Sequence, residues 1–583
     1  MPKLSRTYNN RSGINTSDKA GRSWLYQAVK SGDHKNISKL LKSGANPNLQ
    51  NHKRRAPLHV AVENNDFTAV SMLLEHGACV EIGAVENITP LMLSMDSSVD
   101  IRIVRALLNH VQDVHYTDSD GYTVAHYWAQ FGDAERFSLL LAKGVDFNMA
   151  SKISSYRPVH IAIPQNLKLL SAQGVDIFAK TIKSKTSLHI AAKNGDLDSA
   201  EVLLSALEKD YIGRYSSVFK EKDFTPLMEA ASNGHLDVVE RLLEFGFDAN
   251  QQNWYGQTAL FFAVIKQHED VVRTLVRHGA DVNGFDLKNR NQKNLLHYAV
   301  ELGHEGIFHF LLEAGAAIDT KDSQKYTPLF RAVMSMNVGF VKALLEAGAN
   351  PNIAALFGNR PIDVIAGRAP HKEAIEITKL LIDAGADVGP NDEFYDDHFP
   401  IHSAINSACL PIVDLIVKTD RKNLELRQED DPCFTPFLFA VSENRQNIAA
   451  MLLKHGADKD ALDVSRKNAL HLSVIKGNDK TALWLIQDMA LNVNAQDLDL
   501  QTPLHYAVEN YDVELMQILV FNGADLTLKN KDGKTPLDIA IEQNDDDVVD
   551  YFKTVMKSND NNQQQKILPK RPKKTQKYWG RGI

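Results

Sequence analysis

Cysteine is scarce in this sequence of 583 residues, with Cys79, Cys409 and Cys433 as its three representatives. None of them belongs to a Cys-x-x-Cys pair, which excludes a disulfide framework and a thiolate zinc finger and suits a reducing compartment. No apolar run reaches the length of about 18 residues that a membrane-spanning helix needs, and no signal-peptide core follows the polar residues 1–22. We therefore expect a soluble protein that does not enter the secretory route.

A dominant charge of one sign is also missing. The net charge is −8, and acidic and basic side chains, together 24% of the residues, are mixed along the sequence. Proteins that bind nucleic acid neutralise phosphates with clustered Lys and Arg. The body of the chain is therefore not predicted to bind nucleic acid.

Catalytic motifs are incomplete or missing. The segment 532–535, "DGKT", resembles the end of a phosphate-binding loop, but Leu528 stands where that loop needs a glycine. The segments 268–272 and 304–308 each lack the second histidine of a zinc-protease HExxH motif. No Gly-x-Ser-x-Gly or kinase motif occurs. We predict a chain that is not an enzyme and that holds no cofactor or metal.

What the sequence does contain is an internal repeat. We take as the marker of each copy the residue aligned with Thr502 of "TPLH", 502–505; it recurs at steps of 29 to 39 residues, most of them 33 or 34. Such a period predicts an array in which each copy covers the apolar face of the next. The markers are Ser23, Ala56, Thr89, Thr123, Arg157, Thr186, Thr225, Thr258, Asn294, Thr327, Arg360, Phe399, Thr435, Asn468, Thr502 and Thr535.

The fifteenth copy, residues 497–530, shows the form of one unit. Thr502 is expected to cap a helix by accepting an amide with its hydroxyl, and Pro503 suits the first helical position. Gly523 is expected to end a second helix in the left-handed conformation. The predicted buried residues are Leu504, Ala507 and Val508 on the first helix and Val513, Met516, Leu519 and Val520 on the second.

Histidine is frequent, with 21 in the chain, and eight of these stand at the same place, three residues after a marker. A histidine that recurs with the repeat is more plausibly structural than a metal ligand or a catalytic group. We predict that each ring links neighbouring loops by hydrogen bonds. The eight are His59, His126, His160, His189, His297, His402, His471 and His505.

The sequence resembles the ankyrin-repeat family. "TPLH" at 502–505 has close variants at 56–59, 157–160, 186–189 and 468–471. A helix-ending "GAxxN" or a near variant recurs at 44–48, 144–148, 246–250, 279–283 and 348–352. The resemblance implies an all-α solenoid of about sixteen helix–turn–helix–hairpin units. It also implies a scaffold or adaptor that binds partner proteins through its concave face and turn tips.

The predicted organisation is a polar extension at 1–17, the array at 18–557 and a basic tail at 558–583, with both termini short and disordered. The array is irregular at 151–222 and 360–432. The fifth copy is short, and its Pro164 stands where the first helix should end. We interpret the irregularity as drift in a tolerant array, with a bend or a functional loop as the alternative.

Aromatic side chains recur in the turns before the markers. Turns in this fold are expected to project from the stack, and Trp and Tyr are frequent anchors of interfaces. We hypothesise that copies seven to eleven hold an extended partner segment; the alternative is that each ring packs on the adjacent turn. The candidates are Tyr122, Tyr156, Phe224, Tyr326 and Phe434, directly before a marker, and Trp254, Tyr255 and Phe357, slightly earlier.

The tail combines seven basic residues with no acidic one between 566 and 581. Lys570, Arg571, Lys573 and Lys574 fit a nuclear-import signal or an anion-binding arm, and a solubilising disordered end is the alternative.

Three functions stay open at this point: a general scaffold, a secreted bacterial or pathogen effector acting on host proteins, and a nuclear regulatory adaptor. The expected partners are one or more proteins, with no small-molecule substrate, no membrane insertion and nucleic acid only weakly through the tail. The expected compartment is the cytoplasm, with the nucleus or the host cytoplasm under the two alternatives.

Overall fold

The computed structural model describes residues 13–209, 224–283, 291–368, 371–390, 399–427 and 433–560. Within these ranges the regular structure is helical, with no strand beyond an isolated bridge between Ser17 and Ser23. The all-α architecture predicted from the repeat is confirmed. The import-signal candidates Lys570, Arg571, Lys573 and Lys574 lie outside the described residues.

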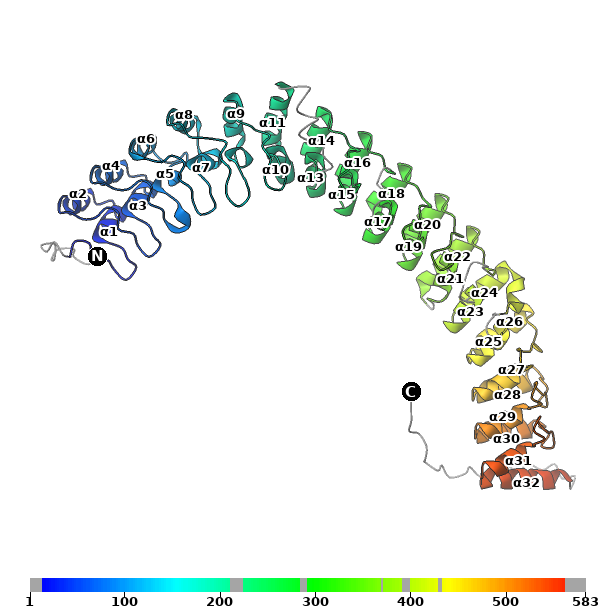
Figure 1. Ribbon diagram of the computed structural model, residues 1–583. Helices are drawn as coiled ribbons and strands as arrows, with labels where there is room; N and C mark the ends of the chain where they lie inside the picture. Colours follow the sequence, from blue (N-terminus) through cyan, green and yellow to red (C-terminus); the bar gives the residue numbers. More distant parts are fainter. Residues whose placement is uncertain are drawn as a thin grey trace. The chain divides into compact units, whose positions relative to one another are not determined.

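The chain divides into two compact parts, Met1–Asn289 and Arg290–Ile583, which we call the N-terminal half and the C-terminal half. Each copy in the N-terminal half contributes a first and a second helix (Figure 1). The first helices are α1 (Trp24–Lys30), α3 (Pro57–Glu63), α5 (Pro90–Leu93), α7 (Val124–Phe131), the 3-10 turn η2 (Pro158–His160), α10 (Ser187–Asn194), α13 (Pro226–Asn233) and α15 (Ala259–Ile265). The second helices are α2 (His34–Lys42), α4 (Phe67–Glu75), α6 (Ile101–His110), α8 (Ala134–Ala142), α9 (Pro164–Ala172), α11 (Leu197–Lys209), α14 (Leu236–Phe245) and α16 (Glu269–Arg277). A 3-10 turn, η1 (Val85–Asn87), precedes α5.

The C-terminal half repeats the same plan. Its first helices are α17 (Leu295–Leu302), α19 (Pro328–Met334), α21 (Pro361–Ala366), α23 (Pro400–Asn406), α25 (Pro436–Ser442), α27 (Ala469–Ile475), α29 (Pro503–Glu509) and α31 (Pro536–Glu542). Its second helices are α18 (Glu305–Glu313), α20 (Val338–Glu346), α22 (Lys372–Asp383), α24 (Leu410–Thr419), α26 (Gln446–His455), α28 (Asp479–Gln487), α30 (Val513–Phe521) and α32 (Asp546–Asp560). A further 3-10 turn, η3 (Arg421–Glu425), follows α24.

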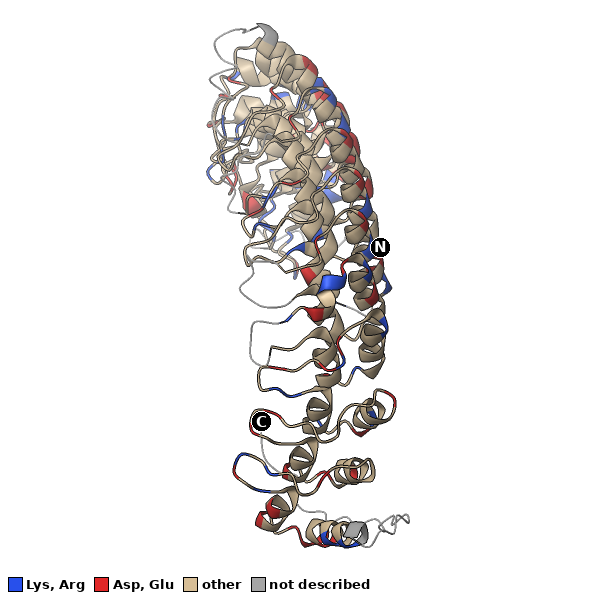
Figure 2. Cartoon of the chain, turned by 90° about the vertical axis from the view of Figure 1, so that its right-hand side faces the viewer, with Lys and Arg blue, Asp and Glu red and all other residues tan. Residues whose placement is uncertain are grey.

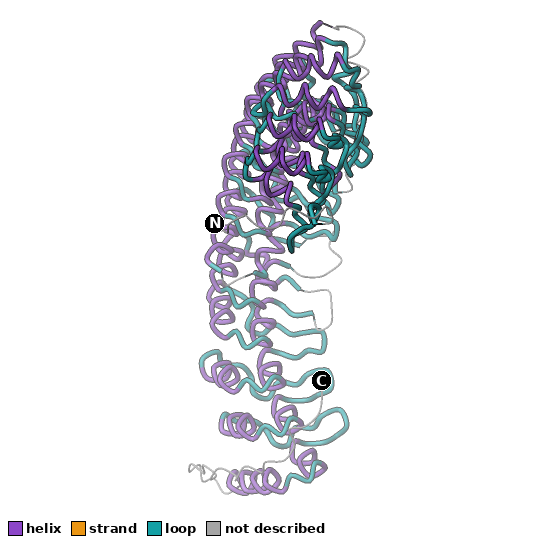
Figure 3. The backbone as a smooth tube through the Cα atoms, turned by 90° about the vertical axis from the view of Figure 1, so that its left-hand side faces the viewer, coloured by secondary structure: helices purple, strands orange, loops and turns teal. Residues whose placement is uncertain are grey.

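Helices of successive copies stack in two rows within each half. First helices pack on first helices, as α13 does on α15 and α27 on α29; second helices do the same, as α14 does on α16 and α28 on α30. The turns between copies project to one side of the helices (Figure 3). Acidic and basic residues are interspersed over the helices and turns (Figure 2).

The core of the fifteenth copy differs in detail from the prediction. Its first-helix residues, Leu504, Ala507 and Val508, are buried as expected, and so are Met516 and Leu519 on α30. Leu515 completes the buried stripe of α30, whereas Val513 and Val520 are half-buried, so the prediction is wrong for these two. The reason is that α30 begins at Val513, and its core-facing side starts two residues later.

Every marker residue directly precedes the first helix of its copy, or the 3-10 turn in the fifth. The hydroxyls of Thr225 and Thr327 accept an amide of the first helical turn at 3.2 and 3.1 Å. The hydroxyl of Thr502 lies instead 2.8 Å from Nδ1 of His505. The predicted bond from a helix amide to the Thr502 hydroxyl is therefore wrong, because the amide of His505 donates instead to the carbonyl oxygen of Thr502 at 3.0 Å.

The fifth copy lacks a full first helix. Only η2 stands in its place, and Pro164 is the first residue of α9 rather than the end of a first helix. Proline has no N–H to donate and its φ suits the first helical position, so it starts a helix well and continues one badly. The irregularity predicted around residue 164 is therefore a shortened first helix followed by a regular second one.

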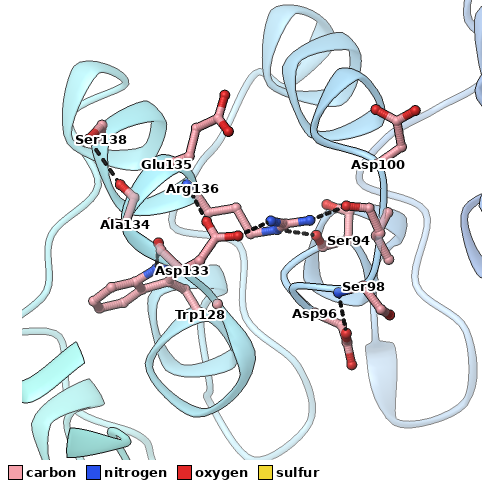
Figure 4. Close-up of polar contacts among 12 residues, drawn as sticks. Ser94, Asp96, Ser98, Asp100, Trp128, Asp133, Ala134, Glu135, Arg136 and Ser138 are labelled. Carbon is pink, nitrogen blue, oxygen red and sulfur yellow. Dashed lines mark hydrogen bonds and ion pairs between the residues drawn. The ribbon is translucent and has the colours of Figure 1, made fainter. Parts of the chain in front are cut away.

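Copies four and five are joined to the copy before them by buried polar side chains. Arg136 on α8 is 2% exposed; its Nε donates to the carbonyl oxygen of Ser94 at 3.3 Å, and its guanidinium also reaches Asp133 and the carbonyl of Val99 (Figure 4). Asn166 on α9 is 1% exposed, and its Nδ2 lies 3.0–3.2 Å from the carbonyl oxygens of Trp128, Ala129 and Gly132. These bonds link each copy to backbone carbonyls of the preceding one; those of Trp128 and Ala129 also accept the amides of Gly132 and Ile163.

Candidate functional site

The turn that precedes each first helix has a fixed conformation, which the fifteenth copy illustrates. Oδ1 of Asp497 accepts the amides of Asp499 and Gln501, both at 2.9 Å. The amide of Asp497 donates to the carbonyl of Gln501 at 3.1 Å, and Leu500 adopts a left-handed φ of 56°. A carboxylate that bonds amides two and four residues on holds the turn closed. We call the five residues before a marker the tip.

The same arrangement recurs along the chain, and its signal was present in the sequence. An Asp or Asn stands five residues before the marker and accepts two backbone amides of its own tip in most of the regular copies. Residues with this role are Asp18, Asn51, Asp118, Asn253, Asp322, Asp497 and Asn530. An Asp or Asn that recurs five residues before the marker is thus the sequence feature that identifies the tips.

Neighbouring tips are joined by a ladder of backbone hydrogen bonds. The N–H of the fourth residue before a marker donates to a carbonyl in the preceding tip. Examples are His52 to Ala20 at 3.1 Å, Ser119 to Glu86 at 2.8 Å, Ile182 to Ser154 at 3.3 Å, Leu356 to Gln324 at 3.0 Å, Leu498 to Ser465 at 2.9 Å and Lys531 to Asp499 at 2.8 Å. Within each half, the tips that it joins therefore keep a fixed register.

Most of the recurrent histidines link their copy to the next, as predicted. Nε2 of His126 lies 2.9 Å from the carbonyl oxygen of Tyr156, and Nε2 of His297 lies 2.8 Å from that of Tyr326. In both rings Nδ1 accepts the marker's amide, so Nε2 carries the proton and the ring is neutral. The same pair of bonds holds His59, His471 and His505.

Burial opposes protonation of these rings. It lowers the pKa of His471 to about 4 and that of His189 to about 3, since a buried imidazolium loses its hydration. The pKa values of His126, His160 and His297 are also lowered, with burial as the largest cause. The described residues contain no group of three or more side chains arranged to hold a metal ion.

Four of the aromatic residues directly before a marker pack on their own or a neighbouring copy. Ring centroids of Tyr326 and Phe330 are 4.6 Å apart, with the guanidinium of Arg331 4.7 Å from the Tyr326 ring. Phe224 lies 4.6 Å from Phe262. The other pairs are Tyr122 with His126 and Tyr156 with His160. All four rings, and that of Phe434, are half-buried. The expectation that these rings are exposed and make no packing contacts is therefore not met.

The three aromatic residues that lie earlier in their tips are different. Trp254, Tyr255 and Phe357 are 69%, 73% and 66% exposed. Trp254, Tyr255 and the half-buried Phe224 lie in the N-terminal half, whereas Tyr326 and Phe357 lie in the C-terminal half. A single groove running from copy seven to copy eleven stays a prediction.

Apart from Trp254, the apolar residues at the fourth position before the marker are not among the predicted candidates. Val85, Ile153, Ile182, Trp254, Leu356, Val464 and Leu498 all occupy this position and are 47–70% exposed. The sequence signal was an apolar residue inside an otherwise polar turn. Ile182, Leu356 and Leu498 themselves donate bonds of the ladder, which fixes their position relative to the preceding tip.

Comparison with known proteins agrees with this architecture. A family model described as "Ankyrin repeats (3 copies)" matches residues 25–118, 125–212, 188–286, 283–355, 366–463, 421–497 and 470–565. The chain therefore belongs to the ankyrin-repeat family. Repeats of this family typically act as non-enzymatic protein-interaction modules.

Relatives of known identity include human Rabankyrin-5, 27% identical over 57% of this chain and 30% of its own length. The human transient receptor potential cation channel subfamily A member 1 is 23% identical over 73% of this chain and 38% of its own length. The crystal structure of the ankyrin repeat domain of Bcl-3 covers 40% of this chain and 98% of its own, with 26% identity and a TM-score of 0.33. The chain spans about a third of the length of the two relatives. None of its described helices has the length and apolar character needed to cross a bilayer.

Proposed function

We propose that the chain is a non-enzymatic scaffold that binds partner proteins through the exposed apolar side chains of its tips. The observation that carries the proposal is the pair Trp254 and Tyr255, 69% and 73% exposed on a tip closed by Asn253. Large rings on a preordered turn lose little conformational entropy on binding, and Trp and Tyr are enriched among residues that dominate binding energy.

The test replaces these two rings. Full-length protein and the double variant Trp254→Ala with Tyr255→Ala are used to capture partners from a cell lysate, and binding of each identified partner is then measured with purified components. We expect a loss of roughly 2–4 kcal/mol in binding free energy, with unchanged circular dichroism and melting.

The matched control is Tyr511→Ala, which removes an exposed ring, 58% accessible, from the turn between α29 and α30. Partner binding should survive this change. Equal binding by the Trp254 and Tyr255 double variant would refute the proposed surface. Tyr326 is not suitable for this test, because its ring stacks on Phe330 and its removal would disturb packing.

The narrower functions of effector and nuclear adaptor rest on the sequence alone. The basic tail that suggests nuclear import is outside the described residues. Fusion of residues 558–583 to a fluorescent reporter, with and without Ala at Lys570, Arg571, Lys573 and Lys574, separates the nuclear adaptor from the general scaffold.

A further inference from the structure

One stretch of the chain has a charge opposite to that of the whole. The chain has a net charge of −8, yet residues 147–186 contain six Lys and Arg side chains and Asp176 as their one acid. Oδ2 of Asp176 lies 3.5 Å from Nη1 of Arg157, and Nζ of Lys185 lies 2.9 Å from Glu229. The other lysines of this stretch, Lys152, Lys168, Lys180 and Lys183, are exposed.

Two exposed isoleucines stand on the adjacent tips of this stretch. Ile153 in the fifth copy is 66% exposed, and Ile182 in the sixth is 70% exposed. The amide of Ile182 donates to the carbonyl of Ser154 at 3.3 Å, which fixes one tip against the other. Isolated exposed aliphatic residues are common on protein surfaces, but two on neighbouring turns that are bonded to each other form an organised apolar surface.

The fifth tip is one residue longer than its neighbours, and the added residue is Ile153. The amide of Ser151 donates to the carbonyl of Tyr156, closing six residues, whereas Thr181 and Lys185 close five. The ladder bond of this tip is made by the amide of Lys152, to Asp120 at 3.1 Å. Ile153 therefore lies between the two residues that hold the ladder and has no counterpart in the regular tips.

Two more isoleucines continue the apolar surface below the tips. Ile161 and Ile190 stand four residues after the markers Arg157 and Thr186, and both are half-buried. In other copies this position reaches the base of the tip: the hydroxyl of Tyr127 donates to Asp118 at 2.9 Å. Ile161 and Ile190 thus extend the apolar surface from the tips toward the first helices.

Lysines border this surface. Lys152 directly precedes Ile153 and Lys183 directly follows Ile182; both side chains are exposed. Within the described ranges neither ammonium group takes part in an ion pair. We call the set Lys152, Ile153, Ile161, Ile182, Lys183 and Ile190 the basic isoleucine surface.

We propose that the basic isoleucine surface binds an acidic segment of a partner protein, in which aliphatic or aromatic side chains stand among Asp and Glu. This inference rests on the proposed protein-binding function and assigns it a second site and a partner chemistry. Charge complementarity selects an acidic occupant, because carboxylates would meet Lys152 and Lys183 while apolar side chains cover the isoleucines. The four aliphatic side chains at the centre of the surface offer no flat ring on which a base could stack, which favours a protein segment over a nucleic acid.

The experiment selects random peptides displayed on phage against the full-length protein and measures the enriched peptides by fluorescence anisotropy. We expect enrichment of Asp and Glu next to apolar residues, and weaker binding as salt is raised. The variant Lys152→Glu with Lys183→Glu should weaken these peptides by roughly tenfold or more. The variant Ile153→Ser with Ile182→Ser leaves the net charge unchanged and should lower the affinity of these peptides several-fold.

The matched control is Lys35→Glu with Lys42→Glu, which changes net charge equally at two exposed positions of α2. Equal weakening by this control would overturn the proposal by showing a general charge effect. Selected peptides that are not enriched in Asp and Glu would also overturn it. So would acidic peptides that bind both tip variants with unchanged affinity. Sedimentation with phosphatidylserine vesicles that depends on Lys152 and Lys183, without peptide binding, would assign the surface to lipid instead.

The two proposed sites can fail separately. Acidic peptides should bind the Trp254→Ala, Tyr255→Ala variant as they bind the unmodified chain, since those residues lie on the eighth tip. Loss of partner binding at Trp254 therefore leaves the basic isoleucine surface standing, and the reverse also holds.

Discussion

The fifth and the fifteenth copies solve the same packing problem in different ways. The fifteenth has a full first helix, α29, and a tip closed by the carboxylate of Asp497. The fifth has only η2 and a longer tip in which the hydroxyl of Ser151 accepts the amide of Tyr156 at 3.0 Å. Asn166, bonded to the fourth copy, replaces part of the lost apolar packing with polar contacts. A copy can therefore lose most of its first helix and stay in the stack, provided that its side chains still bond to the backbone carbonyls of the preceding copy.

The largest expected difference between the two regions is in local opening. Repeats are stabilised mainly by their neighbours, so the weakest interfaces should open first. We expect amides of η2 and α9 to exchange through openings that cost several kcal/mol less than those of α27 and α29. Hydrogen exchange with mass spectrometry measures this directly, and uniform protection across copies five and thirteen to fifteen would contradict it.

Acid should weaken the regular region through its buried histidines. The pKa of His471 is about 4 in the folded chain, below the unfolded value of about 6.5, because burial disfavours the imidazolium. Its stabilising contribution is fully present above about pH 6.5 and is lost as the pH falls toward 4, since the unfolded chain then takes up the proton first. The expected loss is roughly 3 kcal/mol, measured by urea unfolding across this pH range. In His471→Gln the free energy of unfolding should depend less steeply on pH. An unchanged pH dependence would show that other groups cause it.

Removing the polar link of the fifth copy should have a smaller effect. Asn166→Ala takes a buried donor away from the carbonyls of Trp128, Ala129 and Gly132, and should cost about 1–3 kcal/mol. Thermal and denaturant unfolding of the full chain measure the change. The control is Gln165→Ala on the same helix, where the side chain is exposed and stability should stay within about 0.5 kcal/mol. Equal effects of the two substitutions would remove the structural role assigned to Asn166.

The smallest effect is expected at the fifteenth tip. Leu500 adopts a φ of 56°, a conformation that costs a branched side chain about 1 kcal/mol and costs glycine little. Leu500→Gly should leave the melting temperature unchanged or raise it slightly. Glycine also increases the conformational entropy of the unfolded chain, which offsets part of the gain. Leu498→Gly on the same tip, at an ordinary φ, should lower stability by a comparable amount. A marked destabilisation by Leu500→Gly would mean that its side chain packs in solution.

Much of this fold could be predicted because its information is local and periodic. Each marker stands at the start of a helix or 3-10 turn, and most recurrent histidines reach the next copy, since both roles depend on residues a fixed distance away. The exposure of the tips could not be predicted as well. Whether a ring before a marker is free depends on its packing partners, as with Phe330 beside Tyr326 and Phe262 beside Phe224. Such contacts depend on the shape of side chains in the same and the neighbouring copy, which the repeat pattern does not specify.

The ladder between tips leaves evolution unusual freedom. Its bonds join main-chain atoms alone, and the residues that donate in it include a histidine, serines, an isoleucine, leucines and a lysine. Side chains at this position can thus be exchanged one at a time without changing the scaffold, and proline is the replacement that the bond itself forbids, because it has no N–H. New binding specificities can therefore arise by single substitutions at the ladder positions of successive tips, while the backbone geometry of the tips stays the same.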